Sequence, residues 1–164
     1  MGDVFDSIAS FFSHFEKHGN YCEIDKEKKS VELIISGEYE QYDVLCFIDE
    51  TDIFRLYIRN ILKVPRGKMA YACVLANMIN EEAFPTFTIS TDDGDLMSGI
   101  HFPVKGCKLS RDTVKLIFGI TVTHTDMYYP AFQKLINTDV NPKEALEARV
   151  AAASYLNVGP RKKE

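Results

Sequence analysis

The chain of 164 residues is 46% hydrophobic and 26% charged, and its formal net charge is −5 at pH 7. This length favours one domain with a sizeable core, and the balance of residue types is that of a folded protein. The acidic excess argues against nucleic acid and membrane surfaces as partners, and no hydrophobic run is long enough to span a bilayer.

The N-terminus has an early acid and no basic segment, so a secretory signal peptide is not expected. The cysteines lie far apart in the sequence and include no C-x-x-C pair, which argues against a structural zinc site. They are Cys22, Cys46, Cys73 and Cys107. We expect free thiols and a cytoplasmic protein.

From Val4 to Phe15, apolar and aromatic residues recur at helical spacing, with Asp3 as a candidate N-cap and Gly19 as a candidate stop. The pattern predicts a first helix with a strongly aromatic face. The period then changes to two.

Three segments alternate apolar and polar residues, at 31–35, 42–48 and 54–58. The connectors between them, at 36–38 and 49–52, are short enough for hairpins. We therefore expect three neighbouring antiparallel strands.

Pro65 suits the first turn of a helix, because its missing N–H needs no partner there. Residues 69–79 are apolar nearly all round, which predicts a helix enclosed in a core or in a subunit interface. Two further strands are predicted at 87–89 and 100–102. The acidic segment between them reads as a hairpin turn in which Gly94 supplies a positive φ.

Ser110 is a candidate N-cap of a long amphipathic helix that runs to Leu135. Pro130 lies inside this pattern and should kink or loosen the helix. The sequence of residues 141–144 combines an N-cap, a proline and a glutamate in the order typical of a helix start. It predicts a final helix that ends near Tyr155.

The expected order is helix, three strands, helix, two strands, helix, with one C-terminal helix added. Consecutive hairpins favour an α+β fold with a five-stranded, mostly antiparallel sheet.

In the order of its predicted helices and strands, the chain resembles the YbjN family of putative bacterial sensory transduction regulators. Proteins of this family are similar in fold to type III secretion chaperones. The resemblance rests on residues 62–65 with the helix that follows, on the strand pair 87–89 and 100–103, and on residues 126–135. It covers roughly residues 5–137. We therefore divide the chain into a domain of residues 1–137 and an appended helix with a basic tail at residues 138–164.

The resemblance implies a curved five-stranded sheet with helices on one side, usually paired into a dimer. It implies no catalytic residues and no cofactor. We expect a homodimer, because an apolar helix, an aromatic helix and an added C-terminal helix are more than one sheet covers. The expected function is that of a non-enzymatic protein-interaction module, chaperone-like or regulatory, with a protein or peptide partner.

Arg55, Tyr57 and Arg59 share the face of their predicted strand that lies opposite its apolar residues. Arginine and tyrosine are enriched at binding hot spots, so we predict a partner-binding site at these three positions. The alternative is a solvated sheet face, because arginine and tyrosine also stack without any partner.

His14 and His18 are four positions apart on the first helix, which is a metal-ligand spacing. They border the aromatic face, so histidines that cover the core are the favoured interpretation. A small metal-binding protein or enzyme that uses these two histidines is the alternative function. The sequence carries no phosphate loop and no nucleophile elbow, and we assign no catalytic residue, no metal and no cofactor.

Overall fold

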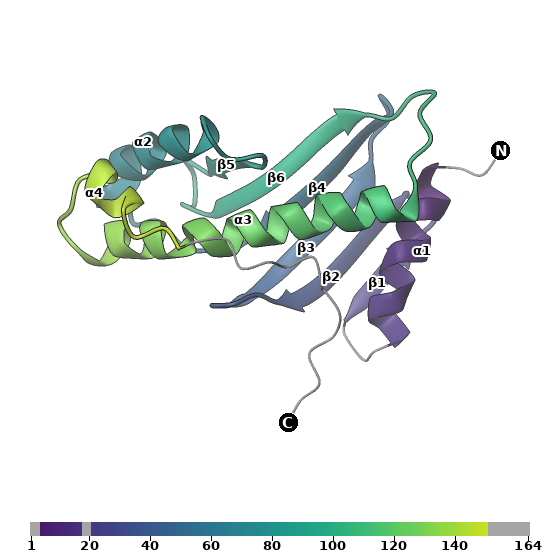
Figure 1. Ribbon diagram of the computed structural model, residues 1–164, viewed down its shortest axis with the longest axis horizontal. Helices are drawn as coiled ribbons and strands as arrows, with labels where there is room; N and C mark the ends of the chain where they lie inside the picture. The colour runs from purple at the N-terminus through teal and green to yellow at the C-terminus, as the bar shows by residue number, and fades with distance from the viewer. Residues whose placement is uncertain (1–3, 18–20, 151–164) are drawn as a thin grey trace.

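The computed structural model describes residues 4–17 and 21–150. They form an α+β fold with one antiparallel sheet of six strands in the order β1-β2-β3-β4-β6-β5 (Figure 1). The strands are β1 (Cys22–Asp25), β2 (Ser30–Ser36), β3 (Gln41–Ile48), β4 (Ile53–Arg59), β5 (Thr86–Ile89) and β6 (Leu96–Pro103). The helices are α1 (Val4–Lys17), the 3₁₀ turn η1 (Arg66–Lys68), α2 (Met69–Asn80), α3 (Arg111–Asn137) and α4 (Pro142–Leu146).

Period-two alternation decides which side of each strand is buried. Leu33, Val44 and Leu56 point to the same side and are almost fully buried. Neighbouring strands from β2 to β4 pair in antiparallel register, as the short connectors predict. The turn between β5 and β6 also forms as predicted, and Gly94 there has a φ of +79°.

The sheet has six strands and not the five that were predicted. The additional strand is β1, which the sequence pattern did not predict. Cys22–Asp25 is only four residues long, and two of its residues are acids. A hairpin brings it alongside β2, with Lys29 at a φ of 50° and the Asp25 carboxylate accepting two turn amides. Long-range pairing therefore makes a strand that local alternation is too short to reveal.

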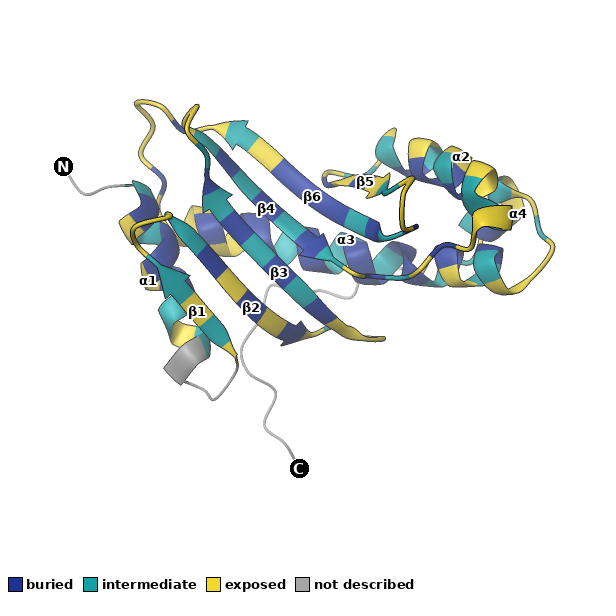
Figure 2. Ribbon diagram, turned by 180° about the vertical axis from the view of Figure 1, so that it is seen from behind, coloured by how far each residue is buried: buried dark blue, intermediate teal, exposed yellow. Residues whose placement is uncertain are grey.

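Helices α1 and α3 cover one face of the sheet (Figure 1). The aromatic face of α1 packs on α3, where the Phe11, Phe12 and Phe15 rings lie 5.3 to 5.7 Å from the ring of Phe118. Helices α2 and α4 pack together with β5 around the C-terminal half of α3 (Figure 2). The candidate N-cap Asp3 and the candidate stop Gly19 lie outside the described residues.

Helix α3 begins as the sequence predicts, with the Ser110 hydroxyl accepting the amide of Thr113 at 3.1 Å. The helix continues through Pro130 to Asn137 without a break. No helix formed by the residues described is both long enough and apolar enough to cross a membrane.

Helix α2 is enclosed on one side only. It buries Leu75 and Ile79 but leaves Tyr71 and Val74 about half exposed, at 53% and 49%. The core of this chain therefore encloses one side of the helix, and enclosure of the other side by a subunit interface stays a prediction.

Helix α4 has the predicted capping box, in which Asn141 and Glu144 exchange side-chain bonds to each other's amides. The prediction that it runs to Tyr155 is wrong, because the helix ends at Leu146. The following turn places Arg149 on Glu82 and lets the amide of Val150 bond to the carbonyl of Met127 in α3. Docking on α3 thus ends the helix.

Candidate functional site

The sheet face that points away from α1 and α3 is the candidate site, and we call it the open face. Figure 2 views the sheet from this side, and partly or fully exposed residues alternate there with buried ones along β2, β3 and β4. No described helix packs on this side of β2, β3 or β4 (Figures 1 and 2). Its residues are Glu32, Ile34, Asp43, Leu45, Phe47, Arg55, Tyr57, Arg59, Met97 and His101.

The structure brings Arg55, Tyr57 and Arg59 together on this face, as the alternation of β4 predicts. Their strand neighbours Leu56 and Ile58 are fully buried on the other side. All three are partly exposed and lie opposite residues of β3. Arg55 and Tyr57 also lie opposite residues of β6. Whether they bind a partner stays a prediction.

Tyr57 is held at the centre of the open face by a glycine in the neighbouring strand. Gly99 lies opposite Tyr57, and a Cβ built on Gly99 would lie 2.6 Å from Cδ1 of that ring. On the other side, the Phe47 ring centroid is 6.3 Å from that of Tyr57, and Leu45 is directly opposite in β3. The ring thus fills the space that the missing side chain leaves, and an apolar centre results.

Arg55 is oriented by the turn between β3 and β4. Its Nε donates to Oδ2 of Asp49 at 2.8 Å, and its Nη1 lies 3.4 Å from the Tyr57 hydroxyl. The Thr51 hydroxyl and Arg55 together hold the pKa of Asp49 well below its usual range. Arg55 therefore stabilises the turn between β3 and β4 and also contacts the edge of the apolar centre at Tyr57.

Arg59 makes weaker contacts with its neighbours than Arg55 does. Its Nη2 lies 3.4 Å from Oε2 of Glu32, and its buried Nε has no hydrogen-bond partner among the described residues. The neighbouring carboxylate of Asp43 is occupied by the amide of Asn60 at 2.8 Å. Arg59 is thus held less tightly than Arg55, whose Nε lies 2.8 Å from its carboxylate partner.

Leu45, Phe47 and Gly99 are parts of this site that were not predicted from the sequence. Alternation in β3 places Leu45 and Phe47 opposite the buried Val44 and Cys46, so the signal was present. The contact between Tyr57 and Gly99 joins two distant strands, and nothing local reveals it.

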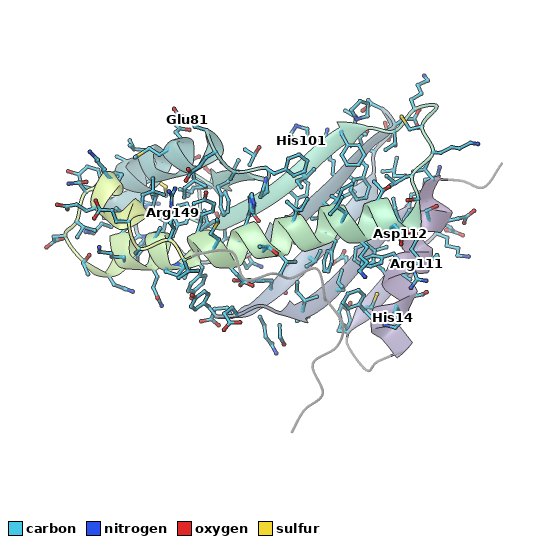
Figure 3. All side chains as sticks on the ribbon, in the orientation of Figure 1. His14, Glu81, His101, Arg111, Asp112 and Arg149 are labelled. Carbon is cyan, nitrogen blue, oxygen red and sulfur yellow. The ribbon has the colours of Figure 1, made fainter. Side chains whose placement is uncertain are left out.

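The structure does not assemble a metal site from the candidate histidines. His14 is exposed on α1 (Figure 3), and His18 lies outside the described residues. Within residues 4–17 and 21–150, no group of three histidine, cysteine, aspartate or glutamate side chains is arranged to hold a metal ion.

The acidic turn between β5 and β6 is engaged internally. Lys63 Nζ lies 2.6 Å from Asp95 and 4.0 Å from Asp93. This pairing agrees with a structural role for the turn.

No protein-family model matches this chain, and no curated protein matches it. The resemblance to the YbjN family therefore stays a prediction.

Proposed function

We propose that this chain is a non-enzymatic protein-interaction module, chaperone-like or regulatory, that holds a segment of a partner protein on its open face. One observation carries the proposal: an apolar centre of Leu45, Phe47 and Tyr57 is partly exposed and has Arg55 and Arg59 beside it. Aromatic and arginine side chains in this combination are those that dominate binding energy at interfaces.

The arrangement is also largely pre-formed. Gly99 leaves room for the Tyr57 ring, and the Asp49 turn holds Arg55. Side chains that are already ordered lose little conformational entropy on binding, which favours affinity. A solvated face made only of charged residues would need neither feature.

We also propose that the chain forms a homodimer, with the outer face of α2 in the interface. Tyr71 and Val74 are exposed there, and Cys73 and Met78 are partly exposed beside them. Static light scattering at micromolar concentration is expected to give twice the mass of 18.6 kDa. A mass equal to the monomer would refute this proposal. A cytoplasmic location is part of the same proposal, and free cysteines in the described residues agree with it.

The binding proposal is tested by affinity recovery of partners from the native cell with two variants. Phe47→Ser with Tyr57→Ser removes the apolar centre, while Glu27→Ser changes an exposed residue of the β1–β2 turn. We expect the double variant to lose a partner that the wild type and the control retain. If all three recover the same proteins, the open face is not the binding site.

A further inference from the structure

Strand β6 is longer than its outer neighbour β5. Their pairing runs from Ile89 opposite Leu96 to Thr86 opposite Gly99, whereas β6 continues to Pro103. From residue 100 to 103, β6 therefore has only β4 beside it among the described strands. We call the outer side of these four residues the free edge; Figure 1 shows β6 running past β5.

The direction of the backbone groups at the free edge follows from hydrogen bonds at both ends of β6. The amides of Leu96 and Val104 bond to carbonyls on the β4 side. Because these groups alternate along an antiparallel strand, the even-numbered residues face β4 and the odd-numbered ones face outward. The N–H and C=O of His101 thus point to the free edge, as does the C=O of Pro103, which accepts a bond from Cys107 Sγ at 3.9 Å.

A cavity of about 540 Å³ lies along the same edge, on the helix side of the sheet. It is lined by Phe84, Thr86, Gly99, Ile100, His101, Phe102, Thr113 and Ile117. Phe84 at its rim is 62% exposed, and the Phe84 amide is fixed by a 3.2 Å bond to Nδ1 of His124. Unpaired strand backbone and an apolar cavity are the two parts of a site that binds a peptide by strand addition.

The segment that follows the free edge is strongly basic in an otherwise acidic chain. Residues 104–115 contain four exposed cations and a single acid, Asp112. None of these cations forms an ion pair with a described side chain; they are Lys105, Lys108, Arg111 and Lys115. Figure 3 shows Arg111 and Asp112 at the start of α3, beyond the end of β6. A ligand that reaches this end of the edge is therefore favoured if it is acidic.

We propose that the free edge binds an extended, acidic segment of another protein by strand addition. The segment runs antiparallel to β6, in the direction of β5, so its N-terminal end lies beside Lys105 and Lys108. Acidic residues occupy that end, and an apolar side chain further along enters the cavity beside Ile117. This site lies on the edge of the sheet and adjoins the open face at His101, and its proposal does not depend on the function proposed above.

Two other candidate occupants, the chain's own C-terminal residues and a second copy of the chain, fit this edge less well than an acidic segment of another protein. Residues 151–164 of the chain itself carry three cations at 161–163 and one acid, Glu164, which does not complement the basic segment. A second copy that added its β1 strand here would make a head-to-tail contact, which builds a ring or a filament and not a closed pair.

The test begins with a phage-displayed library of random peptides, panned on the full chain. Peptides that bind are expected to share acidic residues followed by alternating apolar ones, and the strongest is made as a fluorescent peptide. His101→Pro removes the only outward N–H of the free edge, and His101→Ala is its matched control, which keeps that N–H. The proline should bind about tenfold more weakly than the alanine, which lacks the same side chain but keeps the N–H.

A second variant tests the charge without touching the strand. Lys105→Glu with Lys108→Glu is expected to weaken the same peptide about tenfold at low salt, and less at high salt. This variant decides the matter if His101→Pro fails to fold.

Four results would overturn the proposal. They are a basic or uncharged consensus, the absence of any binding peptide, binding that ignores the charge variant, and equal binding by the two folded His101 variants. Tighter binding by a chain that lacks residues 151–164 would assign the edge to the tail instead. A mass that grows with concentration and returns to a fixed value in His101→Pro would assign it to a second copy.

Discussion

Tyr42 in β3 and Asp126 in α3 are 84 positions apart, and a buried hydrogen bond of 2.7 Å joins the tyrosine hydroxyl to Oδ1 of the aspartate. The same oxygen accepts the amide of Glu38 at 3.0 Å. Gly37 makes the approach possible, because a Cβ there would overlap the Tyr42 ring. The bond ties α3 to the turn between β2 and β3 and so fixes the helix over the sheet.

Removing the hydroxyl of Tyr42 is expected to destabilise the fold. Tyr42→Phe keeps the ring but takes a donor from a buried carboxylate, which costs about 1–3 kcal/mol. Tyr39→Phe is the control, because Tyr39 is exposed and its ring still stacks on Tyr129. Urea denaturation of both variants measures the difference, and equal stabilities would show that the bond contributes nothing.

A methyl group at Gly99 is expected to damage the open face. Gly99→Ala places a Cβ against the Tyr57 ring and 3.0 Å from the carbonyl oxygen of Leu56, so the ring must move. We expect weaker partner binding and a loss of about 1 kcal/mol in stability. Gly67→Ala is the control, because nothing lies within 4 Å of a Cβ at that glycine. Wild-type binding by Gly99→Ala would show that the position of Tyr57 does not matter.

The two arginines of the open face should behave differently. Arg55→Ala removes the arginine that pairs with Asp49. Because the Asp49 carboxylate accepts hydrogen bonds from the Thr51 and Ile53 amides, hydrogen exchange at these two amides is expected to become faster. Arg59→Ala is expected to leave those amides unchanged and to weaken partner binding. Similar exchange in the two variants would show that Arg55 is not part of the turn.

His124 makes stability depend on pH. Burial lowers its pKa, against an opposing effect of Glu82, and its Nδ1 accepts the Phe84 amide, which requires a neutral ring. Because the folded pKa lies below the unfolded value of 6.5, the stabilisation is complete above pH 6.5 and is lost as the pH falls through the folded pKa.

An NMR titration checks this directly. The His124 ring should titrate with a midpoint below 6.5, and the Phe84 amide should shift with the same midpoint. In His124→Gln, stability should fall less steeply on acidification. A midpoint at or above 6.5 would contradict the burial of the neutral ring.

Local patterns in this sequence predict most of the elements. Alternation locates β2, β3 and β4, and the caps at Ser110 and Asn141 locate the starts of two helices. Each of these signals involves side chains a few positions apart, so the sequence displays them directly.

The missed features depend on contacts between distant segments. β1 forms only because β2 lies beside it, and α4 ends where the chain docks on Met127. In the candidate site, β4 alone predicts which face carries Tyr57, but the space over Gly99 exists only once β6 pairs with β4. The spacing of residue types along the sequence does not predict such contacts.

Site-specific photo-crosslinking in the native cell is the sharpest test of whether the open face holds a segment of a partner protein. A photoreactive phenylalanine analogue at position 57 lies at the centre of the open face, and the same analogue at position 27 lies on the exposed β1–β2 turn. We expect a discrete adduct with another protein from position 57 and none from position 27. If position 57 gives no adduct, or if both positions give the same ones, the open face does not hold a partner segment.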